Sequence, residues 1–239
     1  MPGPDPKILA RAFDLPPEEA IAYLESKGIK VSWRWKDVVD EAAQQSFTVA
    51  KAMKMDILQD IRGAVDAALK NGETFTSFQQ KIAPTLRAKG WWGKDENGNQ
   101  LGSPHRLKTI YRTNMQGSYN AGRWKEQQES AKDYPWLQYV AVLDGSTRET
   151  HAAMDGFIAR ADDPVWNTIY PPNGYNCRCR VENISAEEAA EAGGASPKSK
   201  IPPGFPDEGF KSGPSLANWT PIQSDYDPDI YAAGEEDAD

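Results

Sequence analysis

Apolar residues recur three and four positions apart through much of the first half of the chain. This is the period of a helix with one buried face, and it strongly restricts how the chain can fold. Gly28 and Asn71-Gly72 are typical helix ends, and Pro84 is expected to kink or restart a helix. Asn97-Gly98 favours a turn in a loop or hairpin over residues 90–103. The pattern predicts helices over about residues 16–27, 38–53, 57–70, 76–86 and 104–132.

The pattern changes after residue 132. Residues 137–144 have strand character, residues 145–180 are rich in turn-forming residues, and residues 178–181 are suited to a closing strand. We therefore expect an α+β fold, with a mostly helical N-terminal half, a small strand-and-loop C-terminal half and an extended acidic tail. The expected division is a helical region over 1–103, a core over 104–192 and a Pro/Gly-rich acidic tail over 193–239.

The charge of the chain is concentrated at its end. The 239 residues carry a formal charge of −8, and residues 225–239 hold seven carboxylates. This excess of acid argues against a protein that coats DNA, which needs clustered Lys and Arg. The tail is too polar to bury a core of its own and is expected to be extended or disordered. Trp219 within it is expected to anchor the tail on a partner.

Two features bear on location. The chain has no run of 18 apolar residues, so no membrane-spanning segment is expected. Its first residues lack the basic and apolar regions of a signal peptide, which predicts synthesis in the cytoplasm.

Cys177, Cys179 and His151 are the candidate metal ligands. A disulfide between cysteines one residue apart is strained, and cytoplasmic proteins rarely keep structural disulfides. Thiolate and imidazole are ligands that zinc prefers, with Asp155 or water in the fourth position. The alternative is that both cysteines are small buried apolar residues and that His151 hydrogen-bonds a loop. The sequence leaves both interpretations open.

Catalysis by these residues is not expected. A zinc deaminase has a Glu two residues after the histidine and two residues between its cysteines, whereas His151 is followed by Ala152-Ala153. A Cys–His–Asn arrangement has the right residue types, but the sequence does not fix its geometry. His105, the only other histidine, lies 46 residues upstream of His151, so general-base chemistry has few candidates.

Arg112, Asn120 and Arg123 share one face of the long predicted helix. One interpretation is that this face meets phosphate or acidic groups of a partner. We favour the other, in which the arginines bind carbonyls and carboxylates of the 140–180 loops, because loop-rich regions leave many backbone acceptors to satisfy.

The order and spacing of several short motifs resemble the phage Mu F-like head morphogenesis family. The match covers about 80 residues well, and the helices upstream resemble the family more loosely. The motifs are Arg112-Thr113, Asn120-Ala121-Gly122-Arg123, Asp144, Thr147-Arg148, His151, Asp155-Gly156, Pro171-Pro172-Asn173-Gly174 and Asn176-Cys177-Arg178-Cys179.

The resemblance implies a non-enzymatic minor head protein of a tailed bacteriophage, made in the host cytoplasm and located in the virion. Its implied partners are the portal protein, the major capsid protein or packaged DNA, and its implied role is in head assembly or DNA delivery. Arg148 would have a structural or partner-binding role, and no catalytic residues carry over. Some members have extra C-terminal domains, whereas this chain ends in the acidic tail. The alternative is a small metal-dependent nuclease or toxin-like enzyme.

Overall fold

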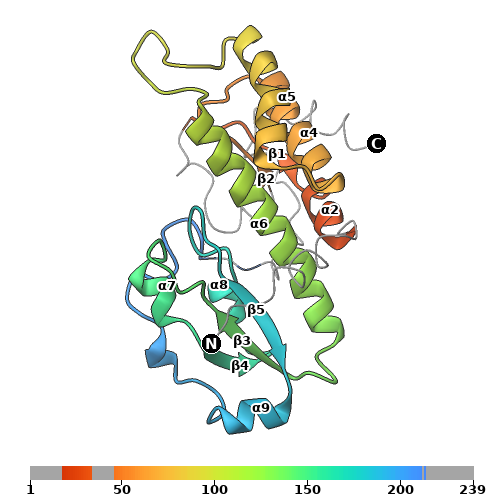
Figure 1. The fold of residues 1–239 in the computed structure, drawn as a ribbon, viewed down its shortest axis with the longest axis vertical. Coiled ribbons are helices and arrows are strands. Elements are labelled where there is room, and N and C mark those ends of the chain that lie inside the picture. The colour runs from red at the N-terminus through yellow and green to blue at the C-terminus, as the bar shows by residue number, and fades with distance from the viewer. Residues whose placement is uncertain (1–17, 34–45, 212, 214–239) are drawn as a thin grey trace, which may run out of the picture.

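One long helix, α6 (Pro104–Glu129), runs past a helical part and a sheet part of the molecule (Figure 1). The computed structural model describes residues 18–33, 46–211 and 213. Within these residues, a mostly helical N-terminal half precedes a C-terminal half built on a sheet, which confirms the predicted α+β class.

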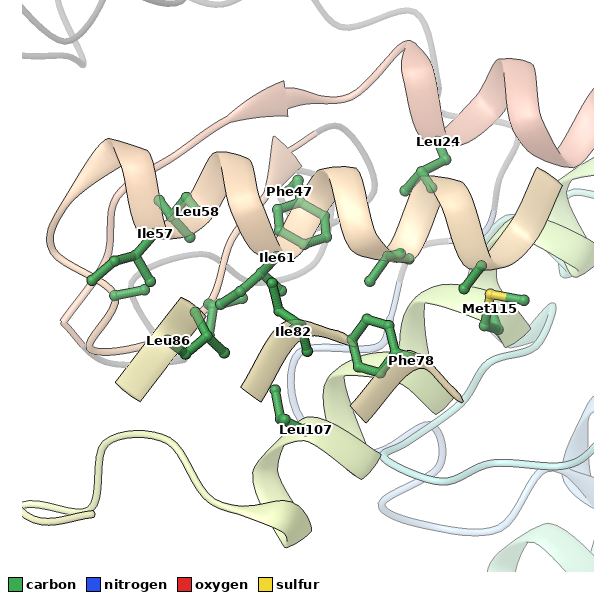
Figure 2. Close-up of a cluster of buried hydrophobic side chains, with 14 of the residues drawn as sticks. Leu24, Phe47, Ile57, Leu58, Ile61, Phe78, Ile82, Leu86, Leu107 and Met115 are labelled. Carbon is green, nitrogen blue, oxygen red and sulfur yellow. The ribbon is translucent and has the colours of Figure 1, made fainter. Parts of the chain in front are cut away.

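The helical part is assembled from α2 (Glu18–Glu25), α4 (Met55–Lys70), α5 (Phe75–Ala88) and the first half of α6. The Thr74 side chain caps α5 and the Ser103 side chain caps α6, which satisfies backbone N–H groups at both starts. The helix α5 continues through Pro84 to Ala88. The helices enclose a core that includes Leu58, Ile61, Phe78, Leu86 and Leu107 (Figure 2).

The helix predicted over residues 38–53 is wrong for its described portion. Ser46–Phe47 is a short strand, β2, which pairs in parallel with β1 (Gly28–Ile29). Phe47 is buried, so the sequence correctly marked it as a core residue. The helical spacing assigned to it was wrong. The segment around it contains Phe, Thr and Val, which favour extended backbone. Residues 34–45 lie outside the described residues.

The sheet part contains three antiparallel strands in the order β4-β3-β5. The central strand β3 (Trp136–Val140) and the edge strand β5 (Arg180–Ile184) overlap the two regions expected to form strands, residues 137–144 and 178–181. Residues 145–180 were expected to be loop-rich, yet they also form β4 (Phe157–Arg160). The short helices around the sheet are α7 (Glu149–Ala153), α8 (Trp166–Ile169) and α9 (Ala186–Glu191).

Glutamine side chains join α6 to the sheet part. Gln116 Nε2 donates to the Cys179 carbonyl at 3.2 Å, Gln127 Nε2 to the Val181 carbonyl at 2.9 Å and Gln128 Nε2 to the Ala161 carbonyl at 3.2 Å.

The helix α2 packs across α6 at Gly122. A Cβ at this glycine would lie 3.0 Å from the Ala20 backbone nitrogen. The small residue therefore permits the close approach of the two helices. Nearby, Lys125 Nζ lies 2.7 Å from Glu19 Oε2, in an exposed ion pair.

The first part of the predicted tail packs against the sheet part. The Ser196 hydroxyl accepts a hydrogen bond from the Ile158 N–H at 3.0 Å, and Lys200 Nζ donates to the Asp155 carbonyl at 2.9 Å. The Phe205 ring is buried in the sheet-part core. Residues 193–211, which include the 3-10 turn Lys198–Lys200, therefore belong to the folded domain. Residues 214–239 lie outside the described residues, and so does the predicted anchor Trp219.

None of the helices in the described ranges is long and apolar enough to cross a membrane.

Candidate metal centre

His151, Cys177 and Cys179 form one compact buried cluster. The Cys177 and Cys179 sulfur atoms lie 3.7 and 3.6 Å from His151 Nδ1, and the ligand atoms of all three residues lie within 4.8 Å of one another. Each residue is at most 6% exposed. The structure thus brings together three of the four residues that the sequence suggested as metal ligands.

Two chain segments supply these side chains. His151 lies on the short helix α7, whereas both cysteines lie in the segment that leads into β5. A turn precedes the first cysteine, because the Cys177 N–H donates to the Gly174 carbonyl at 3.1 Å. Asn176 within this turn has a φ of 58°, in the left-handed region that Asn tolerates better than most residues. This turn directly precedes the Cys-x-Cys pair.

The two thiols have different electrostatic environments. Hydrogen bonds from Cys177, and then from His151 and Tyr139, lower the pKa of Cys179 below its ordinary value. A hydrogen bond with Cys179, together with burial, raises the pKa of the Cys177 thiol above its ordinary value.

A polar network continues behind Cys179. Tyr139 contributes to the lowered pKa of Cys179, and Asn173 Nδ2 donates to the Tyr139 oxygen at 3.1 Å. Asn173 Nδ2 also donates to the Ile169 carbonyl at 2.7 Å. Burial raises the pKa of Tyr139, so its hydroxyl stays protonated. Within the described residues, Asn173 Oδ1 is buried without a hydrogen-bond partner.

The segment 193–211 covers the other side of the histidine. Asp207 Oδ1 lies 3.9 Å from His151 Nε2, and Asp207 Oδ2 lies 3.6 Å from an Arg148 guanidinium nitrogen. The Phe205 ring meets the imidazole edge to face at a centroid distance of 5.2 Å. Gly174 makes room for the carboxylate, because a Cβ there would lie 2.2 Å from Asp207 Oδ2.

Two arginines hold the loops around the cluster. Arg148 donates to the Tyr175 carbonyl at 2.8 Å, and one of its nitrogens lies 3.5 Å from His151 Nε2. Arg178 binds both carboxylate oxygens of Asp144 at 2.6 Å. This bidentate contact holds the pKa of the Asp144 carboxyl well below its ordinary value. Arg148 thus has contacts suited to its expected structural role.

The fourth suggested ligand, Asp155, lies outside the cluster. It follows the end of α7, and its Oδ1 atom accepts a hydrogen bond from the Ala141 N–H at 2.8 Å. Its carboxylate is therefore engaged in tying the loop after α7 to the end of β3.

The polar strip expected on the long helix contributes little to this region. Arg123 donates to Asn120 Oδ1 at 3.3 Å, within the same helix. Arg112 is exposed and makes no hydrogen bond or ion pair with the described residues. The hydrogen bonds that the structure describes from α6 to the sheet part come from its glutamines, and the Trp124 ring meets the Tyr170 ring edge to face at a centroid distance of 4.9 Å.

Sequence reasoning did not single out Tyr139, Phe205 or Asp207 as parts of the site. Tyr139 follows the alternation of a strand with one buried face, which identifies a core residue and gives no sign of a sulfur contact. Phe205 and Asp207 lie in a Pro/Gly-rich segment, and nothing in the sequence around them indicates that this segment packs on His151. Asn173 carried the strongest signal, because it belongs to the Pro171-Pro172-Asn173-Gly174 motif.

Comparisons with known proteins point to one phage family. The family described as "Phage Mu protein F like protein" matches residues 59–182, which is more than half of the chain and includes the whole cluster. The chain is 46% identical over 193 residues to "Putative capsid assembly protein F" of Escherichia phage Mu, across 77% of this chain and 44% of that protein. It is 48% identical over 161 residues to "Mu-like prophage FluMu F protein" of Haemophilus influenzae, across 66% of this chain and 39% of that protein.

The chain therefore spans less than half the length of each of these two relatives. No solved structure matches it.

Proposed function

This chain belongs to the phage Mu protein F-like family, and we propose that it is a structural protein that acts in assembly of the phage head. The observation that carries this proposal is the 46% identity, over 77% of the chain, to a protein named for capsid assembly. At this level of identity over nearly two hundred residues, the fold is shared and a related role is the simplest inference.

The finer proposal is a minor head component that binds the portal protein or the major capsid protein, at the portal or inside the procapsid. The overall charge of −8 favours protein partners over a general role in coating DNA. It leaves room for a local contact with packaged DNA during delivery.

The burial of His151, Cys177 and Cys179 favours a structural protein over an enzyme that acts at this cluster. His151, Cys177 and Cys179 are each 6% exposed or less, so a large substrate has no direct access to them. A metal-dependent nuclease that uses magnesium needs carboxylate ligands and an open coordination site for phosphate. The cluster found in the described part of the chain has thiol and imidazole ligands instead. No observation here favours the nuclease alternative.

Deletion of the gene in the phage or prophage that encodes this chain tests the head role. We expect induced cells to accumulate tails and unassembled or aberrant heads, and we expect purified wild-type heads to contain the chain by mass spectrometry. Infectious particles in normal number without the protein would overturn the proposal.

Two truncations separate partner binding from stability. Removal of residues 214–239 leaves Phe205 and Asp207 in place. We expect this protein to keep its melting temperature and to be depleted from heads, because the removed segment carries most of the acidic tail and Trp219. Removal of residues 200–239 also deletes Phe205 and Asp207, and it should lower the melting temperature. If the protein that lacks residues 214–239 enters heads normally, the tail does not bind the partner.

A further inference from the structure

The sulfur atoms of Cys177 and Cys179 are directed at the same imidazole nitrogen. Nδ1 of a neutral imidazole has either one lone pair or one proton, so it makes one good hydrogen bond. Two thiols within 3.7 Å of this atom exceed that capacity. Nδ1 alone therefore cannot hydrogen-bond both sulfurs well at the same time.

The distances match those around a tetrahedral zinc ion. With Zn–S bonds of about 2.3 Å and Zn–N bonds of about 2.0–2.1 Å, the sulfur and nitrogen ligands of such an ion lie about 3.6 Å apart. The corresponding separations here are 3.6 and 3.7 Å. Both sulfur–nitrogen distances thus already match the spacing that coordination requires.

We propose that His151 Nδ1, Cys177 Sγ and Cys179 Sγ bind one zinc ion. Soft thiolates with one imidazole favour zinc over magnesium or calcium, which prefer oxygen ligands. Metal binding releases the thiol protons to solvent, so both sulfurs bind as thiolates. A water molecule occupies the fourth position, since Asp155 is engaged with the Ala141 N–H. This inference does not depend on a role in head assembly.

The surroundings of the cluster also fit a bound metal. Asp207 lies behind the imidazole on the Nε2 side, where histidine ligands of metals commonly face a carboxylate that orients the ring.

The zinc ion would fasten three segments of the chain together. It would join α7 to the turn before β5 directly, and it would hold the ring against which Phe205 and Asp207 pack. Residues 193–211 should then be held to the domain more firmly with metal than without it. Chelation is therefore expected to lower the melting temperature and to speed trypsin cleavage within this segment.

Metal analysis of the untagged full chain, purified without chelator, tests the proposal. We expect about one equivalent of zinc per chain. Replacement of zinc by Co²⁺ under anaerobic conditions should give a sulfur-to-cobalt charge-transfer band and the visible bands of a tetrahedral site. These spectra use the wild-type chain, so they stand even if a ligand variant fails to fold.

Matched variants locate the ion. Cys177→Ser, Cys179→Ser and His151→Gln should each lose zinc, and each cysteine change should reduce the charge-transfer band. His105→Gln changes the other histidine, on the exposed start of α6, and should retain zinc. Asp155→Asn should also retain it.

Two outcomes would overturn the proposal. One is a wild-type chain that holds less than about a tenth of an equivalent, both as purified and after incubation with zinc, and gives no cobalt spectrum. The other is zinc that remains in all three ligand variants, or that is lost equally in His105→Gln, because the metal would then lie elsewhere.

Discussion

Gln127 is the side chain whose replacement should most weaken the contact between α6 and the sheet. It is 3% exposed and makes two hydrogen bonds, donating to the Val181 carbonyl and accepting from the Tyr170 hydroxyl at 2.7 Å. Leucine has a similar size and cannot replace either bond. Gln127→Leu would therefore leave a buried carbonyl and a buried hydroxyl without these partners.

The expected cost follows from the two groups left behind. Each buried polar group that loses its partner costs about 1–3 kcal/mol, so Gln127→Leu should lower the free energy of unfolding by about 2–6 kcal/mol. Adding Tyr170→Phe removes the stranded hydroxyl and should recover about 1–3 kcal/mol of that loss. The double-mutant cycle should accordingly show strong coupling between the two side chains.

Urea unfolding at constant pH, followed by tryptophan fluorescence, measures these differences. The matched control is Arg112→Ala on the same helix, because Arg112 is exposed and has no described partner. This control should change the free energy of unfolding by less than about 0.5 kcal/mol. If Gln127→Leu costs no more than Arg112→Ala, the glutamine does not hold α6 to the sheet. A large cost for Arg112→Ala would restore the arginine bridge expected from the sequence.

Three further changes address the surroundings of the cluster. Gly174→Ala would place a Cβ 2.2 Å from Asp207 Oδ2, and we expect it to lower the free energy of unfolding by about 1–3 kcal/mol; an unchanged urea midpoint would contradict this. Phe205→Ala should cost about 2–4 kcal/mol and speed proteolysis of the segment around it, whereas wild-type resistance would argue against its docking. The folded-state pKa of Asp144 lies below its unfolded value, so its pair with Arg178 stabilises the fold above about pH 4 and this contribution is lost as the pH falls further. Asp144→Asn should therefore flatten the acid limb of a melting-temperature profile, and an unchanged limb would show that the pair has no net effect.

Hydrophobic periodicity predicted the helices well because their buried faces extend over many turns. In α4, Ile57, Ile61 and Val65 all face the core, as their spacing indicated. The same method failed at Phe47, since two apolar residues in a short segment do not distinguish a strand from a helix. It also missed β4, whose Phe157 and neighbours are buried on both faces and therefore show no alternation.

The three residues of the cluster could be picked out from the sequence, but the residues that pack around them could not. Cysteine and histidine are rare in this chain, so Cys177, Cys179 and His151 stood out. Asp155, the suggested fourth ligand, follows the end of α7 at Ala153, and its carboxylate accepts a hydrogen bond from the Ala141 N–H. Asp207, 56 residues after His151 along the chain, reaches the histidine through tertiary packing.

The bridge from α6 to the sheet was assigned to charged residues, whereas neutral amides form it. Burying an arginine carries a large desolvation cost unless its charge is fully paired. An amide donates and accepts without that cost, so Gln127 fits between a carbonyl and a hydroxyl in the interior. Sequence alone did not reveal which residues of the helix would be buried at the sheet.

Because α6 is one unbroken helix, the face that packs on the other helices has a fixed angle relative to the face that packs on the sheet. Leu107 near its start is buried among the other helices, and Gln127 near its end is buried against β5. Each residue of an α-helix turns the chain by about 100° and advances it by about 1.5 Å. One residue inserted between these positions would rotate one contact face relative to the other by more than a quarter turn. Changes of length within α6 are therefore incompatible with keeping both interfaces, whereas the loop around Asn97-Gly98 can change length without altering this angle.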